Sequence, residues 1–169
     1  MALLGLLALT ATASASTPRT GSYKATTSQC GSTARPHPCY TFTIKIAKGR
    51  CFIQGRRGTH PGYCVSFSAK DNRALVFADV TCPDSSTFQS QIDGPGISLV
   101  LPSSGSLRFS SNSYVSEAGK ELVVGVEKVN LSVRGSHISG TLSRLAQENI
   151  GLEPPTCMTG TVSFAAKRL

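Results

Sequence analysis

The sequence lacks the motifs on which the commonest enzyme sites are built. Its 169 residues contain no G-x-S-x-G nucleophile elbow, no phosphate-binding loop and no H-E-x-x-H zinc motif. Ser136 and His137 are neighbours, but adjacent residues on a strand point to opposite faces and cannot share a proton. The sequence therefore predicts no catalytic residue and no cofactor, and it favours a non-enzyme while leaving enzyme activity open.

Tryptophan is absent, and acidic residues are scarce. Nine Asp and Glu stand against 17 Lys and Arg, which gives a formal net charge of +8. Carboxylates from distant parts of a chain can still hydrolyse glycans, and Asp79, Glu121 and Glu127 are the candidates here. Because Asp and Glu are mostly exposed, we interpret these three as surface charges. A secreted hydrolase that acts on glycans through acidic residues stays the alternative to a binding function.

Long hydrophobic runs are also missing. The longest apolar stretch opens the chain, and residues 1–15 show the apolar run and small-residue end of a secretory signal peptide, with cleavage after Ala15. A spanning helix needs about 20 apolar residues, so no membrane span is predicted. We expect a secreted or extracytoplasmic protein, with a linker and first edge strand at 16–36 and the main body of a single domain at 37–169.

Close cysteine pairs of the zinc-binding kind do not occur. The smallest spacing between cysteines is C-x8-C, and the three histidines are scattered at positions 37, 60 and 137, so no metal site is predicted. An even number of cysteines in an exported chain indicates disulfides instead. The six cysteines are Cys30, Cys39, Cys51, Cys64, Cys82 and Cys157.

Six cysteines allow fifteen pairings, and position along the chain favours one of them. Cys30 and Cys39 flank one loop, while Cys51 and Cys64 flank a basic turn. Cys82 ends a predicted strand and Cys157 opens the last one, so a bridge between them would tie the C-terminal strand into the sheet.

What the chain does contain is period-two alternation. Tyr40, Phe42, Ile44 and Ile46 alternate with polar or small residues, as in a strand with one buried face. Further strands are predicted at 23–26, 51–54, 64–68, 74–81, 97–101, 106–110, 121–133, 138–142 and 158–166, with one helical turn at 142–150. In 121–133 the apolar face switches after Glu127, which predicts a bulge. The fold class is all-β: a single antiparallel β-sandwich or flattened barrel, stapled by disulfides.

The basic residues are concentrated in one region, where Lys45, Lys48, Arg50, Arg56 and Arg57 fall close together. If Cys51 and Cys64 are bridged, the two arginines lie at the tip of the closed loop and the others along its base, as a compact positive knob. Such a knob favours anionic cell-envelope polymers or acidic glycans as partners. Only Phe52 is interleaved with the charges, which disfavours nucleic acid. We predict a monomeric binding or structural module of unknown specificity.

Two terminal segments resemble a known group of proteins. Residues 137–142 and 156–168, together with the opening Gly21-Ser22-Tyr23 and the mid-chain Cys82, are similar to uncharacterised secreted β-proteins of high-GC bacteria. The resemblance covers about a third of the chain. It implies the all-β fold and the Cys82–Cys157 pairing, and it implies no activity.

Overall fold

The protein is built from strands alone wherever its structure is described. The computed structural model describes residues 17–28, 39–69, 74–117, 120–146 and 156–169. These residues form one open, mixed sheet and contain no helix, so the all-β prediction is confirmed. The strands are β1 (Gly21–Thr27), β2 (Thr41–Phe52), β3 (Thr59–Ala69), β4 (Val76–Thr81), β5 (Thr87–Ile92), β6 (Leu99–Val100), β7 (Ser106–Glu117), β8 (Lys120–Arg134), β9 (His137–Ala146), β10 (Cys157–Met158) and β11 (Val162–Arg168).

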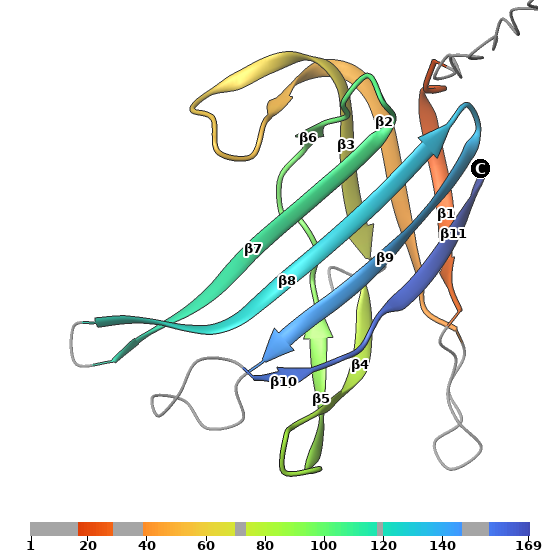
Figure 1. Ribbon diagram of the computed structural model, residues 1–169. Helices are drawn as coiled ribbons and strands as arrows, with labels where there is room; N and C mark the ends of the chain where they lie inside the picture. The colour runs from red at the N-terminus through yellow and green to blue at the C-terminus, as the bar shows by residue number, and fades with distance from the viewer. Residues whose placement is uncertain (1–16, 29–38, 70–73, 118–119, 147–155) are drawn as a thin grey trace, which may run out of the picture.

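The first and last strands meet at the centre of the sheet, so the predicted edge position of the first strand is wrong. β1 lies between β2 and β11, β11 pairs with β9, and β8 and β7 continue on that side. Figure 1 shows that the sheet curls, so that β7 and β8 lie across from β2 and β3. All pairings are antiparallel except that of β2 with β6, where Phe52 pairs with Leu99. The parallel pair departs from the purely antiparallel sheet that was expected.

The inner face of the curl holds the hydrophobic core. Phe42, Ile44 and Ile46 of β2 are buried while Lys45 is exposed, which confirms the predicted alternation. Phe42 packs edge-on against Phe164 of β11, with ring centroids 5.1 Å apart. Gly140 lies opposite Phe164, and a Cβ at Gly140 would come within 2.5 Å of that ring. This glycine makes room for the aromatic pair at the core's centre.

Several element boundaries differ from the prediction. β2 runs unbroken through two predicted strands, and β5 was not predicted at all. Residues 142–146 continue β9 as a strand, so the predicted helical turn is wrong there, and 147–155 lie outside the described residues. The register shift of β8 falls at Val124, opposite Ser113 and Tyr114, which is earlier than predicted. The sequence pattern counted Glu127 as an outward polar residue. In the structure it is buried on the same face as Val129, so the apolar face does not switch at this residue.

Two disulfides follow the predicted pairings. Cys51 is bonded to Cys64 and Cys82 to Cys157, with Cα–Cα distances of 5.7 Å and 4.1 Å. The second bridge joins the end of β4 to β10 and packs in a small buried cluster with Val80. Cys39 is also disulfide-bonded, and its predicted partner Cys30 lies outside the described residues.

The predicted signal peptide, at residues 1–15, likewise lies outside the described part of the chain. Within that part, no helix has the length and apolarity that crossing a membrane would require.

Candidate anion-binding surfaces

The hairpin of β2 and β3, which carries the predicted basic residues, bends back on itself. Cys51 is paired in register with His60, four residues before Cys64, and an extended ladder would keep the two cysteines far apart. Their Cα atoms are nevertheless 5.7 Å apart, so the hairpin must curl between them. Gly49 and Gly62 face each other at this place, and glycines in strands mark sharp bends.

Two further elements hold the bent hairpin in place. The amide of Phe52 donates to the carbonyl of Ser98 at 2.9 Å, and the amide of Leu101 donates to the carbonyl of Tyr63 at 2.7 Å, so β6 bridges both arms. The Gln54 side chain donates to the carbonyl of Ser110 at 2.7 Å and accepts from its amide at 3.3 Å. The hairpin is therefore also attached to the outer edge of β7.

Four of the predicted binding residues lie along this hairpin, and all four are exposed. Arg56 and Arg57 occupy its turn, as predicted for a bridged loop. Arg50 donates to the Thr59 carbonyl at 2.7 Å, and the Lys48 ammonium lies 5.7 Å from the centre of the Tyr63 ring. We call Lys48, Arg50, Arg56 and Arg57 the basic hairpin.

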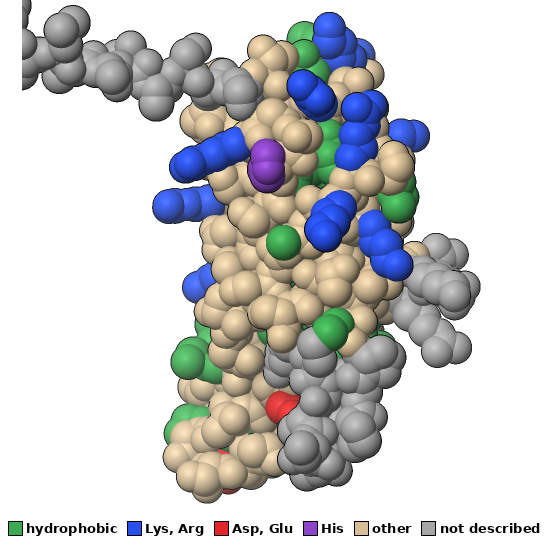
Figure 2. All heavy atoms as spheres, turned by 90° about the vertical axis from the view of Figure 1, so that its right-hand side faces the viewer, with side chains coloured by type: hydrophobic (Ala, Val, Ile, Leu, Met, Phe, Trp, Pro, Cys, Tyr) green, Lys and Arg blue, Asp and Glu red, His purple; other side chains and the backbone are tan. Residues whose placement is uncertain are grey.

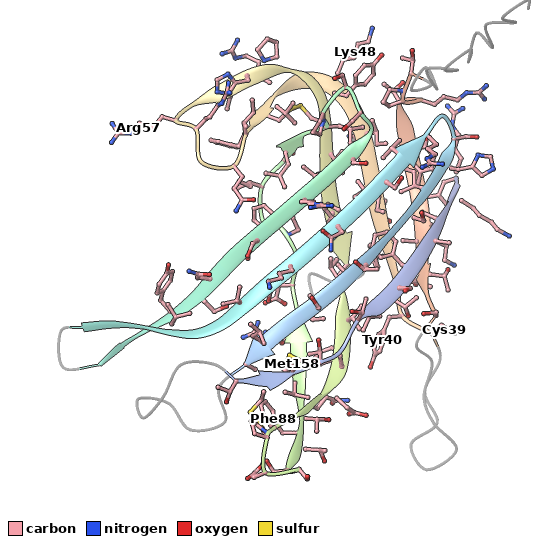
Figure 3. The ribbon with its side chains drawn as sticks, in the orientation of Figure 1. Cys39, Tyr40, Lys48, Arg57, Phe88 and Met158 are labelled. Atoms are coloured by element: carbon pink, nitrogen blue, oxygen red, sulfur yellow. A yellow bond between two sulfur atoms is a disulfide. The ribbon has the colours of Figure 1, made fainter. Side chains whose placement is uncertain are left out.

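The basic hairpin is extended rather than a compact knob. Figure 3 places Lys48 at the bend and Arg57 at the tip, well apart. Lys45, the fifth predicted residue, belongs to the flat part of β2, where it pairs with Ser22 of β1 and Ser66 of β3. The bend separates Lys45 from the arginines although they are close in sequence.

A second group of basic residues lies on the outer face of the curled sheet. Lys24 of β1 is directly opposite Lys167 of β11, and Arg134 of β8 is directly opposite His137 of β9. All four are exposed, and Lys45 lies on the same face. We call Lys24, Lys45, Arg134, His137 and Lys167 the outer basic face. Figure 2 shows Lys and Arg gathered over the upper half of this side of the molecule, with one histidine among them.

Sequence reasoning missed this group because its members are far apart in the chain. Lys24 and Lys167 are brought together only by the pairing of the first strand with the last. The available local signal was that both lysines alternate with apolar residues, which places each of them on an outward face.

The carboxylates whose side chains are described lie away from both basic groups. The neighbouring strands β3, β2, β1, β11 and β9 contain no Asp or Glu. The exposed carboxylates with described side chains are Asp79 of β4, Asp84 and Asp93, all in and around the β4–β5 hairpin. Across the described residues, the only ion pair joins Arg144 to Glu127. No exposed Lys or Arg side chain in those ranges is thus neutralised by a described carboxylate.

Glu127 is not the surface charge that was expected. Its side chain is 6% exposed, and its Oε1 lies 2.6 Å from Nη1 of Arg144. It also accepts hydrogen bonds from the backbone amides of Asp93, at 3.4 Å, and Gly94, at 3.2 Å. Glu127 therefore connects β8 and β9 to the loop after β5. Asp79 is exposed as expected, and nothing is described of the Glu121 side chain.

Among the described residues, two groups have a shifted pKa. The hydroxyl and amide of Ser86 donate to Asp84 and hold the pKa of that carboxyl below its ordinary value. Partial burial, followed by the nearby charge of Asp79, raises the pKa of Tyr40. Asp84 lies apart from the outer basic face, whereas Tyr40 directly precedes β2, and its carbonyl accepts a hydrogen bond from the amide of Thr27 at the end of β1. Neither group belongs to the outer basic face.

No set of three His, Cys, Asp or Glu side chains in the described ranges is arranged to hold a metal ion. No protein-family model, curated protein or solved structure matches the chain. The resemblance to secreted β-proteins of high-GC bacteria stays a prediction.

Proposed function

We propose that this protein is a secreted binding module for anionic polymers, such as cell-envelope polymers or acidic glycans. The observation that carries the proposal is the segregation of charge. Three neighbouring strands that contain no carboxylate, β2, β1 and β11, carry exposed lysines and arginines, while the exposed carboxylates with described side chains lie around β4 and β5. A surface of one sign attracts chains of the opposite sign and raises their encounter rate.

The mode of binding follows from the exposure of these residues. Each exposed charge contributes about 0 to 1 kcal/mol to a contact, so affinity is spread over many residues and is lost as salt screens them. Affinity of this kind suits a repeating polymer, which offers many identical anionic groups.

Export is part of the proposal. The disulfides Cys51–Cys64 and Cys82–Cys157 are consistent with an oxidising location, because thiols stay reduced in most cytosols. Residues 1–15 supply the signal peptide on this account, and the chain acts as a monomer.

The glycan-hydrolase alternative is less well supported. Of its three candidate carboxylates, Glu127 is held in a buried ion pair and Asp79 is exposed on β4. A pair of catalytic carboxyl groups would have to flank one scissile bond. Because Glu127 is committed to this ion pair, binding is favoured over hydrolysis.

Retention on immobilised cell-wall material and on acidic glycans, at low and at high salt, tests the proposal. We expect the wild type to be retained at low salt and released by high salt, and Lys48→Ala/Arg56→Ala/Arg57→Ala to be released at lower salt. The matched control, Lys48→Arg/Arg56→Lys/Arg57→Lys, keeps the charge and should behave as the wild type. Retention that ignores salt, or no retention on any anionic matrix, would overturn the proposal.

A further inference from the structure

We propose that the outer basic face is a second polyanion-binding surface, separate from the basic hairpin, and that one molecule thereby bridges two acidic glycan chains. This inference rests on the binding function proposed above. It adds a site that the sequence did not predict and a cross-linking activity that neither site has alone.

The first feature of this face is a like-charged pair on adjacent strands. Lys24 and Lys167 are directly opposite each other on β1 and β11, so their Cβ atoms are about 5 Å apart. Like charges in such a pair destabilise a sheet. Neither strand contains a carboxylate that could offset this cost. An anionic group between the two ammonium groups would remove the repulsion, which is the behaviour of a binding site.

The basic residues of this face form a row across the strands. Arg134 pairs with His137, which lies one residue beyond the last β9–β11 pair, Ala166 with Ile138. The row thus passes from β8 through β9 and β11 to β1, with one basic residue on each strand. Neighbouring strands are about 4.8 Å apart, so an extended chain laid across them meets a new basic residue at each step.

The surroundings of the row favour a glycan as the ligand. A shallow depression of about 520 Å³ lies on the outer side of β7, β8 and β9. Ser132 and Ser139 line it and pair with each other, two residues along their strands from Arg134 and His137. Its lining also includes Asn130 and Thr141, whose side chains hydrogen-bond to each other at 3.2 Å. Hydroxyl and amide groups beside cations suit a sugar that carries both hydroxyls and acidic groups.

Nucleic acid fits this face less well. The outward positions of β1, β11 and the neighbouring half of β9 hold Ser, Thr, Ala, Lys and His, with no Phe, Tyr or Trp. Single-stranded nucleic acid is bound largely by stacking bases on aromatic side chains, which these positions do not offer.

The two basic surfaces point to different sides of the molecule. In Figure 1 the tip of the β2–β3 hairpin projects to the left, whereas β1 and β11 form the right-hand side. Figure 3 places Arg57 at that left-hand tip. A chain bound along the outer face is therefore out of reach of the hairpin tip, which is available to a second chain.

Light scattering of the full-length protein mixed with heparin, a sulfated glycan, tests the bridging at low salt. We expect the wild type to form large cross-linked particles with long heparin chains and none with heparin tetrasaccharides. Lys24→Ser/Lys167→Ser should still be retained on a heparin column, about two- to fivefold more weakly per removed charge, but should form no large particles. The hairpin variant Lys48→Ala/Arg56→Ala/Arg57→Ala should behave in the same way.

A charge-preserving variant, Lys24→Arg/Lys167→Arg, is the matched control and should cross-link as the wild type does. If the wild type is not retained on heparin or any other anionic matrix, the binding function itself fails. If it is retained but Lys24→Ser/Lys167→Ser cross-links as well as the wild type, the outer-face site is refuted and the binding function stands. Cross-linking of single-stranded DNA but not of heparin would refute the assignment to glycans.

Discussion

Glu127 shows how one residue can determine the packing of distant segments. Its carboxylate receives Nη1 of Arg144 from β9 and two backbone amides from the loop after β5. The same Nη1 donates to the carbonyl of Gln91, and Thr159 forms hydrogen bonds with the Arg144 backbone. A Cβ at Gly125 would lie 2.8 Å from the Arg144 guanidinium, so this glycine leaves room for it. Segments in or next to β5, β8, β9 and β10 thus meet around Glu127 and Arg144.

Glu127→Ala should destabilise the protein by about 3 kcal/mol, because it leaves the Arg144 charge buried without its partner. Urea unfolding of the variant measures this loss. Asp79→Ala, which removes an exposed carboxylate, is the control and should change stability by less than about 0.5 kcal/mol. The double variant Glu127→Leu/Arg144→Met should be more stable than Glu127→Ala, since it removes both charges. Equal stability of Glu127→Ala and wild type would show that the pair is not coupled to folding.

The hydroxyl of Tyr40 is a second group whose surroundings change its pKa. Its pKa is raised above the ordinary value of 10.0, first by partial burial and then by the charge of Asp79. The folded state therefore keeps this proton where the unfolded chain begins to lose it, so the stability it contributes is present below pH 10 and is lost as pH rises through the folded pKa. Asp79→Asn should move the pKa of Tyr40 down toward 10.0 without reaching it, because burial remains.

A spectrophotometric titration of the tyrosines in wild type and Asp79→Asn, each compared with its Tyr40→Phe counterpart, isolates this group. An unchanged Tyr40 titration in Asp79→Asn would exclude the charge of Asp79 as a cause. A fall all the way to 10.0 would exclude burial.

The Cys51–Cys64 disulfide is the covalent contact that holds the bent β2–β3 hairpin, in addition to its hydrogen bonds with β6 and with Ser110. The bridge links residues 13 apart, and a loop of this length stabilises the folded state by about 3 kcal/mol on the chain-entropy model. Cys51→Ser/Cys64→Ser should lose about that amount in urea unfolding. It should also weaken binding by the basic hairpin, because Gly49 and Gly62 allow the bend but do not hold it.

Cys82→Ser/Cys157→Ser is the comparison for this effect. It opens a loop of 75 residues and should cost more stability, about 4.5 kcal/mol. Wherever both variants remain folded, only the first should reduce retention through the hairpin. Equal retention of the Cys51→Ser/Cys64→Ser variant and the wild type on anionic matrices would show that the bend is not needed for binding.

The elements that the sequence predicted are those with a strong local pattern. Phe42, Ile44 and Ile46 alternate with polar or small residues and lie as expected in the core. β5 was missed because its inward side contributes Phe88, Ser90 and Ile92, and the central serine interrupts the apolar pattern. The outer basic face was missed for a different reason. It depends on the pairing of Lys24 with Lys167, and no local periodicity specifies which strands become neighbours.

For the whole molecule, the positive surface that attracts polyanions also lowers the stability of the folded state. Cations on the outer face repel one another, and the formal net charge of +8 adds a general repulsion to the compact state. The acidic side chains around β4 and β5 do not relieve this repulsion at the opposite end. A folded protein that keeps such a surface should gain stability when the charges are screened or reversed, and should then bind polyanions less well.

Lys167→Glu tests whether the repulsion between Lys24 and Lys167 lowers stability while both residues favour polyanion binding. The new carboxylate would lie opposite Lys24, and an opposite-charge cross-strand pair stabilises a sheet by about 0.2 to 1 kcal/mol, in addition to the repulsion that is removed. We therefore expect higher stability than wild type in urea unfolding at low salt, a gain that shrinks at about 1 M salt, where the screening length is about 3 Å. Retention on heparin should fall in the same variant.

Lys128→Glu makes the same change of charge on β8 opposite Ser110 and Ser143, so it controls for net charge alone. If Lys128→Glu gains as much stability as Lys167→Glu, the repulsion is general rather than specific to the Lys24–Lys167 pair, and that pair is not a site built for an anion.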